Sequence, residues 1–420
     1  MLVGHNRRIL VIYASLAFTW LILFQLCRVY TFSDPSSFFY DPRRAYQTRY
    51  TDIRESQADE LLRLANSPTG DLSNSPLINN DSLPQGRGKH LCIGIPSVRR
   101  QREQFLPRAL ASLVEGLSPK QRSAIHIVVL LADDDPTSHP AFGQLWLDRL
   151  ADEVLFYGNT SLDVPERYRN VTSTASGRNR DMSRNDRVHR DYSTLIATCQ
   201  GIGVEYFALI EDDIIASRNW LGRLSTGLDR LEHTEDAANW LYLRLFYSET
   251  YMGWNSEEWR TYLVHALSIY CIVLVVYNLA IMLDMRRRRQ VVTYKPSPYN
   301  IVHLTFWTAS FIALYFLAGR LTVDPFPTGV HEMPNYGCCA QGLVIPHQHL
   351  GALESALHTA SDAIAGDSLI ESFADMRGLK KYAITPSVLQ HVGIRGSSDH
   401  GSRKATWNFS FEKINTRASE

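Results

Sequence analysis

The sequence VEYFALIEDDIIAS, from Val204 to Ser217, combines two features on which the interpretation of the whole chain depends. The run from Tyr206 to Ile210 is short and apolar, which is typical of a strand buried on both faces of a sheet. Three carboxylates, Glu211, Asp212 and Asp213, follow without a gap, and two isoleucines then resume the apolar character. Adjacent like charges repel and resist burial, so a divalent cation bridging to an anionic ligand would stabilise them. The alternative is a solvated acidic turn, but the flanking apolar residues favour a metal site.

Strands and helices alternate on both sides of this stretch. The expected strands are His90–Val98, Ile125–Leu131, Glu153–Tyr157, Tyr206–Ile210 and Trp240–Phe246. The expected helices are Phe105–Leu117, Ala141–Leu150, Arg190–Gly201 and Trp220–Leu231, and the polar segment Val164–Arg190 is expected to be a loop. This alternation predicts an α/β domain with a mainly parallel sheet and helices on both faces.

Charged residues follow three of these strands where each strand ends. Arg99 and Arg100 follow the first strand, Asp133 to Asp135 the second, and Glu211 to Asp213 the fourth. Ligands of parallel α/β sheets bind beyond the carboxyl ends of the strands. The shared location therefore predicts one binding site at this edge of the sheet.

The first membrane signal is the uncharged stretch from Ile9 to Leu26, which has Arg7 and Arg8 before it and Arg28 after it. It is long enough to span a bilayer, and the residues after it offer no good signal-peptidase site. We interpret it as an uncleaved anchor with a short cytosolic tail.

Two further apolar stretches, Tyr262–Leu283 and Ile301–Leu317, lie on either side of a segment with four arginines, Arg286 to Arg289. Two buried core helices are the alternative. Basic residues between two spans of membrane length favour a membrane hairpin with a cytosolic turn.

These signals divide the chain into six segments: a cytosolic tail 1–8, an anchor 9–27, a lumenal stem 28–88, a first globular part 89–260, a hairpin 261–320 and a second globular part 321–420. Most of the stem is expected to be flexible, with one amphipathic helix from Ile53 to Leu64. If the arginine loop is cytosolic, both globular parts lie on the other side of the membrane, in the lumen.

Sequons and cysteines agree with a lumenal location. The sequons are at Asn80, Asn159, Asn170 and Asn408. The cysteines outside the apolar stretches are Cys92, Cys199, Cys338 and Cys339, and four thiols allow three full pairings. Basic and acidic residues balance at 43 each, so nothing in the overall charge suggests a nucleic acid as a partner.

The residues after the hairpin resume a mixed α/β character. Ala363–Arg377 is expected to be helical, with Asp367 near its start and Glu371 one turn later. Short strands are expected at Lys381–Thr385 and Ser387–Val392. About a hundred residues are too few for a separate α/β enzyme, so we expect this part to complete the first domain.

Several motifs follow one another along the chain in a specific order. They are IGIPSVRR at 93–100, the acidic triplet, the inserted pair of apolar stretches, GCCAQGLVIP at 337–346, GDSLIESF at 366–373 and TPSVLQHVG at 385–393. This order resembles the Golgi GPI-anchor N-acetylgalactosaminyltransferase family, in which a GT-A domain is split by a transmembrane hairpin. More distantly it is similar to the N-glycan-branching β-1,4-N-acetylglucosaminyltransferases, which lack the hairpin.

The resemblance implies a GT-A-like fold and a donor site for UDP-GalNAc. The triplet would bind Mn²⁺ or Mg²⁺, with Asp213 as the principal ligand, Glu211 and Asp212 near the metal and the ribose, and His391 completing metal or phosphate binding. The wall of the nucleotide pocket would consist of Pro96, Ser97, Val98 and Arg99. A rival triplet, Asp133, Asp134 and Asp135, would lie near the uracil and the ribose.

The resemblance also implies transfer with inversion, which needs a base for the acceptor hydroxyl. Asp367 is the first candidate and Glu371 the second, although Asp367 also suits a helix N-cap. The implied enzyme is a Golgi membrane protein that adds GalNAc to the mannose core of GPI anchors, with GPI-anchored proteins and the lipid bilayer as partners. The alternatives are an N-glycan-branching N-acetylglucosaminyltransferase and a non-catalytic Golgi membrane scaffold.

Overall fold

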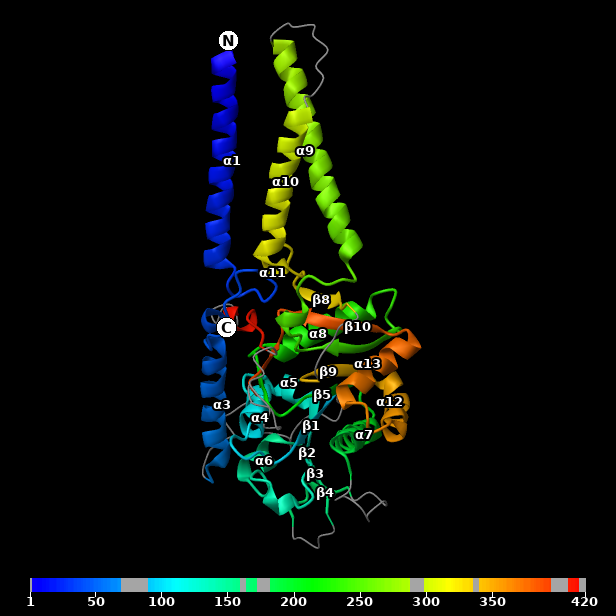
Figure 1. Cartoon of the computed structure of the whole chain (residues 1–420). Coiled ribbons are helices and arrows are strands. Elements are labelled where there is room, and N and C mark those ends of the chain that lie inside the picture. Colours follow the sequence, from blue (N-terminus) through cyan, green and yellow to red (C-terminus); the bar gives the residue numbers. More distant parts are fainter. Residues whose placement is uncertain are drawn as a thin grey trace. The chain divides into compact units, whose positions relative to one another are not determined.

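The structure is a computed structural model that describes residues 2–68, 90–158, 164–171, 182–287, 298–334, 340–393 and 407–414 (Figure 1). Asn80, Asn159, Cys338 and Cys339 lie outside these ranges, as do Arg288 and Arg289. The chain forms two compact units. The first unit contains Met1–Gln47 and Met252–Pro325, and the second contains Thr48–Tyr251 and Phe326–Glu420.

The first unit is helical. Its elements are α1 (Leu2–Tyr30), α2 (Pro42–Ala45), α9 (Trp259–Arg287), α10 (Pro298–Ala318) and α11 (Arg320–Val323). Three stretches in the described residues are long and apolar enough to cross a membrane: Val11–Tyr30, Trp259–Leu283 and Ile301–Ala318. The apolar helices expected at the amino terminus and in the middle of the chain are thus confirmed.

The segment that follows α1 is hydrogen-bonded to the end of α10. Asp34 Oδ2 accepts hydrogen bonds from the backbone N–H of Thr322 at 2.9 Å and from its hydroxyl at 3.0 Å. Gly319 lies between them with φ +94°, and a Cβ there would collide with Asp34. Arg320 pairs with Glu258 at 2.6 Å. We expected most of residues 28–88 to be flexible, but the part next to α1 is fixed to the inserted helices because Asp34 has these donors.

The second unit contains a nine-stranded sheet in the order β4-β3-β2-β1-β5-β9-β7-β10-β8. The strands are β1 (Leu91–Ser97), β2 (Ile125–Leu131), β3 (Glu153–Phe156), β4 (Tyr168–Asn170), β5 (Tyr206–Leu209), β7 (Trp240–Arg244), β8 (Gly329–Glu332), β9 (Leu343–Pro346) and β10 (Lys380–Thr385). The strands β4, β3, β2, β1 and β5 are parallel, as are β7 and β10, so the mainly parallel sheet is confirmed.

Strand β9 shows that the two parts of the chain form one sheet. It comes after the inserted helices in the sequence, yet it pairs antiparallel with β5 on one side and with β7 on the other. Both of these neighbours precede the insertion. The carboxy-terminal part therefore completes the first domain, as expected.

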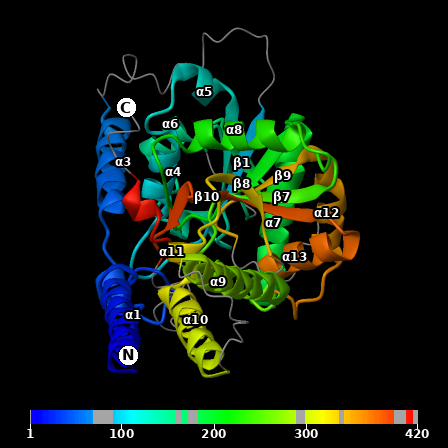
Figure 2. The ribbon, with the colours of Figure 1, turned by 90° about the horizontal axis from the view of Figure 1, so that it is seen from above.

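Helices cover both faces of this sheet (Figures 1 and 2). One layer contains α3 (Tyr50–Asn66), α4 (Leu106–Val114), α6 (Leu145–Leu150) and α8 (Trp220–Glu232), which share one apolar core with the sheet. The other contains α7 (Arg184–Ile202), α12 (His347–Thr359) and α13 (Gly366–Arg377). Short pieces complete the unit: α5 (Pro119–Ser123), the 3₁₀ turns Pro136–Ser138, Glu249–Tyr251 and Phe411–Lys413, and a separate pair of strands, β6 (Ile214–Ala216) and β11 (Leu389–His391).

Helix α7 begins at Arg184, six residues before the start expected from the sequence. The side chain of Ser183 accepts a hydrogen bond from the N–H of Asp186, whose carboxylate accepts one from the N–H of Ser183. This capping box starts the helix inside the polar segment expected to be a loop. A disulfide between Cys92 and Cys199 joins β1 to α7, with 5.7 Å between their Cα atoms.

Candidate functional site

The acidic triplet lies between the end of β5 and the start of β6, at the carboxyl edge of the sheet. Asp212 and Asp213 are buried, and Glu211 is partly exposed. The hydroxyl of Ser97, at the end of β1, donates a hydrogen bond of 2.6 Å to Asp212 Oδ2. Gln341 Nε2, next to β9, donates one of 3.1 Å to Glu211. Side chains at the ends of β1 and β5 and beside the start of β9 thus meet here.

Arg100 is the main cation of this site. Its Nη2 donates to Asp212 Oδ1 and, at 3.2 Å, to Asp213 Oδ2. Its Nε and Nη1 are buried and have no hydrogen-bond partner among the described residues. The side chain is 11% exposed and packs over the ring of Phe105. Buried donors without partners are costly, so this guanidinium presents two donor nitrogens beside the carboxylates that could bind a ligand.

His391 reaches the triplet from the other part of the chain. Its Nε2 lies 3.4 Å from Asp213 Oδ2. Strand β11, which carries His391, pairs antiparallel with β6, directly after the triplet. The backbone N–H of Val392 also donates to the carbonyl of Asp213 at 2.9 Å. The pairing of these short strands therefore determines where His391 lies.

Burial and neighbouring charges shift the pKa values of the three carboxyls in different directions. Burial raises the pKa of Glu211, and repulsion by Asp213 and Asp212 raises it further. Burial also raises the pKa of Asp212, against the attraction of Arg100. Burial acts to raise the pKa of Asp213 as well, but His391 and Arg100 outweigh it and lower that pKa. Asp213 is therefore the carboxylate that most favours its ionised form.

The side chains of this site can be compared with the ligands that a divalent metal ion takes. Oδ1 of Asp213 is buried and has no hydrogen-bond partner in the part of the chain that the structure describes. A carboxylate oxygen and an imidazole nitrogen are ligands that Mn²⁺ accepts. Within the described ranges, no group of three or more His, Cys, Asp or Glu side chains is arranged to hold a metal. The donor types fit a divalent cation that takes two ligands from the protein, Asp213 and His391.

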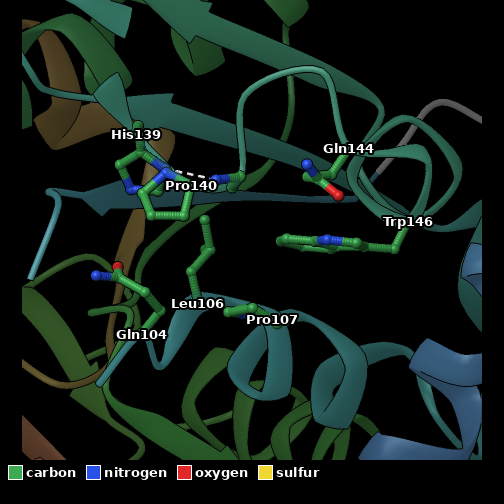
Figure 3. A pocket seen from close by; sticks show the side chains of 8 residues that line it. Gln104, Leu106, Pro107, His139, Pro140, Gln144 and Trp146 are labelled. Carbon is green, nitrogen blue, oxygen red and sulfur yellow. Dashed lines mark hydrogen bonds between the residues drawn. The ribbon is translucent and has the colours of Figure 1, made fainter. Parts of the chain in front are cut away.

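A small pocket of about 170 Å³ lies between the start of α4 and the residues that lead into α6 (Figure 3). It is lined by Gln104, Leu106, Pro107, His139, Pro140, Ala141, Gln144 and Trp146. His139 connects the pocket to the triplet: its Nδ1 accepts a hydrogen bond from the N–H of Ala141, and its Nε2 lies 3.2 Å from Ser97 Oγ. Burial lowers the pKa of His139 to about 4, so the ring is neutral. Because Nδ1 accepts a hydrogen bond, the ring proton lies on Nε2, and this N–H donates a hydrogen bond to Ser97 Oγ.

The two candidate bases, Asp367 and Glu371, have different surroundings in the structure. Asp367 lies in the first turn of α13, partly exposed, and its charge contributes to the raised pKa of Glu211. It does not cap the helix, because the N-cap residue is Ala365. Glu371 instead accepts hydrogen bonds from Arg244 and, at 2.6 Å, from Tyr242, both on β7.

The second cation at Glu371 is Lys381 of β10, whose Nζ lies 3.2 Å from the carboxylate. The Glu371 carboxylate is thus held by three partners on β7 and β10, whereas Asp367 is partly exposed. Asp367 is therefore the better placed of the two.

The residues expected to form the wall of the nucleotide pocket lie at or after the end of β1, and part of this set contacts the triplet. Ser97 contacts it, while Arg99 donates its backbone N–H to Asp133 at 2.9 Å. Asp134 is exposed, and Asp135 caps the 3₁₀ turn by accepting the N–H of Thr137 at 3.0 Å. Pro96 lies within β1, and Val98 is 37% exposed at its end.

The two described sequons differ. Asn170 is exposed at the end of β4. Asn408 is 1% exposed, and its Nδ2 donates to Tyr247 O at 2.9 Å and to Ser387 Oγ at 2.7 Å. A glycan at Asn408 would occupy the position of these bonds, so the structure contradicts that site.

The sequence placed Arg100 at the same edge of the sheet as the triplet, but its contact with the triplet was not predicted. Gln341 belongs to the motif at 337–346, but its contact with Glu211 was not predicted either, and His139 was missed. The contacts of His139 and Gln341 join segments that are distant in the chain, so a local pattern does not reveal them.

Comparison with known proteins gives the family. The model of the family described as GPI-N-acetylgalactosamine transferase PGAP4 matches residues 91–390. Similar curated proteins include alpha-1,3-mannosyl-glycoprotein 4-beta-N-acetylglucosaminyltransferase C of Sus scrofa, 27% identical over 36% of this chain and 32% of its own length. Alpha-1,3-mannosyl-glycoprotein 4-beta-N-acetylglucosaminyltransferase B of Mus musculus is 29% identical over 33% of this chain and 26% of its own length. Alpha-1,6-mannosyl-glycoprotein 4-beta-N-acetylglucosaminyltransferase of Gallus gallus is 26% identical over 44% of this chain and 38% of its own length.

The chain thus spans about a third of the length of the curated relatives that it matches. The family match is broader: it runs from β1 through the triplet and the inserted helices to β11, and so includes both parts of the sheet. The chain belongs to the GPI-N-acetylgalactosamine transferase PGAP4 family.

Proposed function

We propose that this chain transfers N-acetylgalactosamine from UDP-GalNAc to the mannose core of GPI anchors, with inversion and metal assistance, in the Golgi lumen. The observation that carries the proposal is the family match over residues 91–390, which includes the inserted apolar helices as well as the catalytic sheet. The site chemistry described above supports each part of the reaction.

The donor diphosphate would lie at Arg100. Nε and Nη1 of this residue are buried donors without partners within the described ranges, and phosphate oxygens are the acceptors that suit a guanidinium best. Asp213 and His391 would hold Mn²⁺ or Mg²⁺, with Glu211 and Asp212 close by. When bound, the cation would supply positive charge that stabilises the UDP leaving group.

Asp367 would act as the base. The acceptor hydroxyl oxygen forms the new bond to C1 of the sugar, the bond from C1 to the phosphate oxygen breaks, and UDP leaves with that electron pair. The hydroxyl proton passes to Asp367, which belongs to the first turn of α13. Glu371, one turn later, holds this helix to β7 and β10 through Tyr242, Arg244 and Lys381.

The membrane unit suits a lipid-anchored acceptor. The sugars of a GPI anchor lie roughly 10–20 Å above the hydrocarbon core, on the scale of the headgroup layer. The three candidate spans are joined to the catalytic unit by three chain connections, at 47–48, 251–252 and 325–326. A catalytic domain on one flexible stem would sample a much larger volume.

The second candidate function is N-glycan branching, because the curated relatives are named as N-acetylglucosaminyltransferases. Mass spectrometry of glycans from cells that lack this protein separates the two. We expect GPI glycans without the GalNAc branch and normal N-glycan antennae. Unchanged GPI glycans with altered antennae would favour the branching enzyme, and no change in either would favour the non-catalytic scaffold.

A further inference from the structure

The segment Trp407–Ile414, here called the strap, is folded into the second unit. Trp407, Asn408, Phe409 and Phe411 are each at most 3% exposed. The ring of Phe411 lies 5.1 Å from that of Tyr50 at the start of α3, and both belong to an apolar cluster with Ile215 of β6. The strap therefore packs against the short strand that follows the acidic triplet.

Gln390 connects the strap to β11. Its side chain is fully buried, and it exchanges two hydrogen bonds with the backbone of Asn408: Nε2 donates to the carbonyl at 2.9 Å, and Oε1 accepts the N–H at 3.0 Å. Nε2 also donates to Glu412 Oε1 at 3.1 Å. Successive residues of a strand point to opposite faces, so β11 presents Gln390 to the strap and His391 to Asp213.

The strap is itself fixed at three places. Asn408 Nδ2 donates to Tyr247 O, after β7, and to Ser387 Oγ, before β11. Glu249 accepts the backbone N–H groups of Phe409 at 2.6 Å and Ser410 at 2.9 Å.

The third attachment is at α3. Glu412 accepts the first N–H groups of this helix, those of Arg49 at 2.7 Å and Tyr50 at 2.9 Å. Backbone groups that otherwise have no helical partner are satisfied there. The strap thus joins β11 to α3 and to the segment that follows β7.

We propose that Gln390, Asn408 and Glu412 are positioning residues that hold β11 so that His391 faces Asp213. The need for them follows from the strands: β6 and β11 pair over three residues only and form a sheet of their own. A two-stranded pair of this size is marginal by itself. The link from His391 to the donor site rests on the proposed function, whereas the link from the strap to β11 does not.

The test replaces Gln390 by Met, which keeps the length of the side chain and removes its hydrogen bonds. Amide hydrogen exchange should accelerate about tenfold or more at Ile215 and Val392, because losing one buried partner opens the pair more often. The affinity for UDP with Mn²⁺, measured by calorimetry, should fall by a similar factor. Glu412→Gln is a milder variant for use if Gln390→Met does not fold.

The matched control is Arg122→Met. This side chain is also buried, and its Nη1 pairs with Asp152 at 3.0 Å at the opposite edge of the sheet, near the start of β2. It should lower the melting temperature and leave both readouts unchanged. Unchanged exchange at Ile215 and Val392 in Gln390→Met would overturn the inference, whether or not UDP binds. Failure of the wild-type protein to bind UDP would instead overturn the donor proposal, and exchange would still decide the role of the strap.

A double-mutant cycle gives a second arm. If Gln390 acts through His391, Gln390→Met should weaken UDP binding in the wild type and have little further effect in His391→Ala. Equal fold-losses in both backgrounds would reject the coupling and leave Gln390 with a structural role alone.

Discussion

The carboxylate of Asp213 lies 3.4 Å from Nε2 of His391, although the inserted helices separate these residues in the chain. Each part of the divided sequence therefore contributes one of these two neighbouring side chains. In the proposed reaction the two act together, and this relationship makes Asp213 the most informative residue to change.

Asp213→Asn should lower transfer by about 10²–10³-fold, because it removes the most acidic carboxyl of the site and its charge on the donor side. Affinity for UDP with Mn²⁺ should fall with it. The control is Asp134→Asn, an exposed member of the rival triplet, which should have a much smaller effect. If the two variants exchange phenotypes, the triplet at 133–135 is the metal site.

Asp367→Asn should reduce kcat by about 10²–10⁴-fold while donor binding stays near normal, since a base is lost and no donor contact changes. Glu371→Gln should mainly lower stability, because it removes a carboxylate that pairs with Arg244 and Lys381. Steady-state kinetics and thermal unfolding separate these effects. A larger loss of kcat in Glu371→Gln would assign the base to Glu371 instead.

Asp191 predicts a pH-dependent stability. Burial raises its pKa from 3.8 to about 6, against the attraction of Arg190. A raised folded-state pKa gives a stabilising contribution that is complete below pH 3.8 and is lost as the pH rises through 6. Asp191→Asn should therefore flatten the pH dependence between pH 4 and 6.

At pH 7 the Asp191→Asn variant should gain on the order of 1–3 kcal/mol relative to the wild type. Its amide oxygen can still accept the hydroxyl of Tyr157, which donates to Asp191 at 2.9 Å. Chemical denaturation at several pH values measures this. A variant that loses stability at pH 7 would mean that the ion pair with Arg190 outweighs burial.

Glycan occupancy should distinguish the two described sequons. Asn170→Gln should remove one glycan, because Asn170 is exposed. Asn408→Gln should leave the glycan mass unchanged and lower stability, because it disturbs buried hydrogen bonds. Mass spectrometry of the purified protein reads both. A glycan found on Asn408 would require a structure in which the strap is displaced.

The topology expected from the charge pattern can be tested in sealed microsomes. Added protease should remove a tag placed at Arg288 and leave residues 30–258 and 322–420 protected. The pairing of β9 with β5 and β7 supports this, since it requires the residues before and after the inserted helices to lie on one side. Protection of the tag at Arg288 would exclude a cytosolic loop.

The sequence predicted those features that depend on local pattern. The apolar run before the triplet is β5, and the helix that carries Asp367 is α13, because burial on both faces and helical periodicity leave clear signatures. The insertion of β9 between β5 and β7 was beyond such reasoning, since strand order is set by tertiary packing.

The same limit explains the rest of the site. The hydrogen bond of His139 to Ser97 and the contacts of Gln390 with the strap join segments that are distant in the chain. Asn408 shows an error of the opposite kind, a site that was predicted but that the structure excludes. A sequon is a local sequence pattern, whereas the burial that excludes a glycan depends on tertiary packing.

The position of β9 also has a consequence for biosynthesis. Before residues 343–346 are made, β5 and β7 each have an unpaired edge, and such edges bind other chains. By that time the ribosome has already completed both inserted helices. If one of them fails to enter the membrane, β9 emerges on the wrong side and the gap between β5 and β7 stays open. If the inserted helices span the membrane as proposed, the protein therefore matures only in chains whose inserted helices have entered the bilayer correctly, and quality control can reject the others by their unfinished sheet.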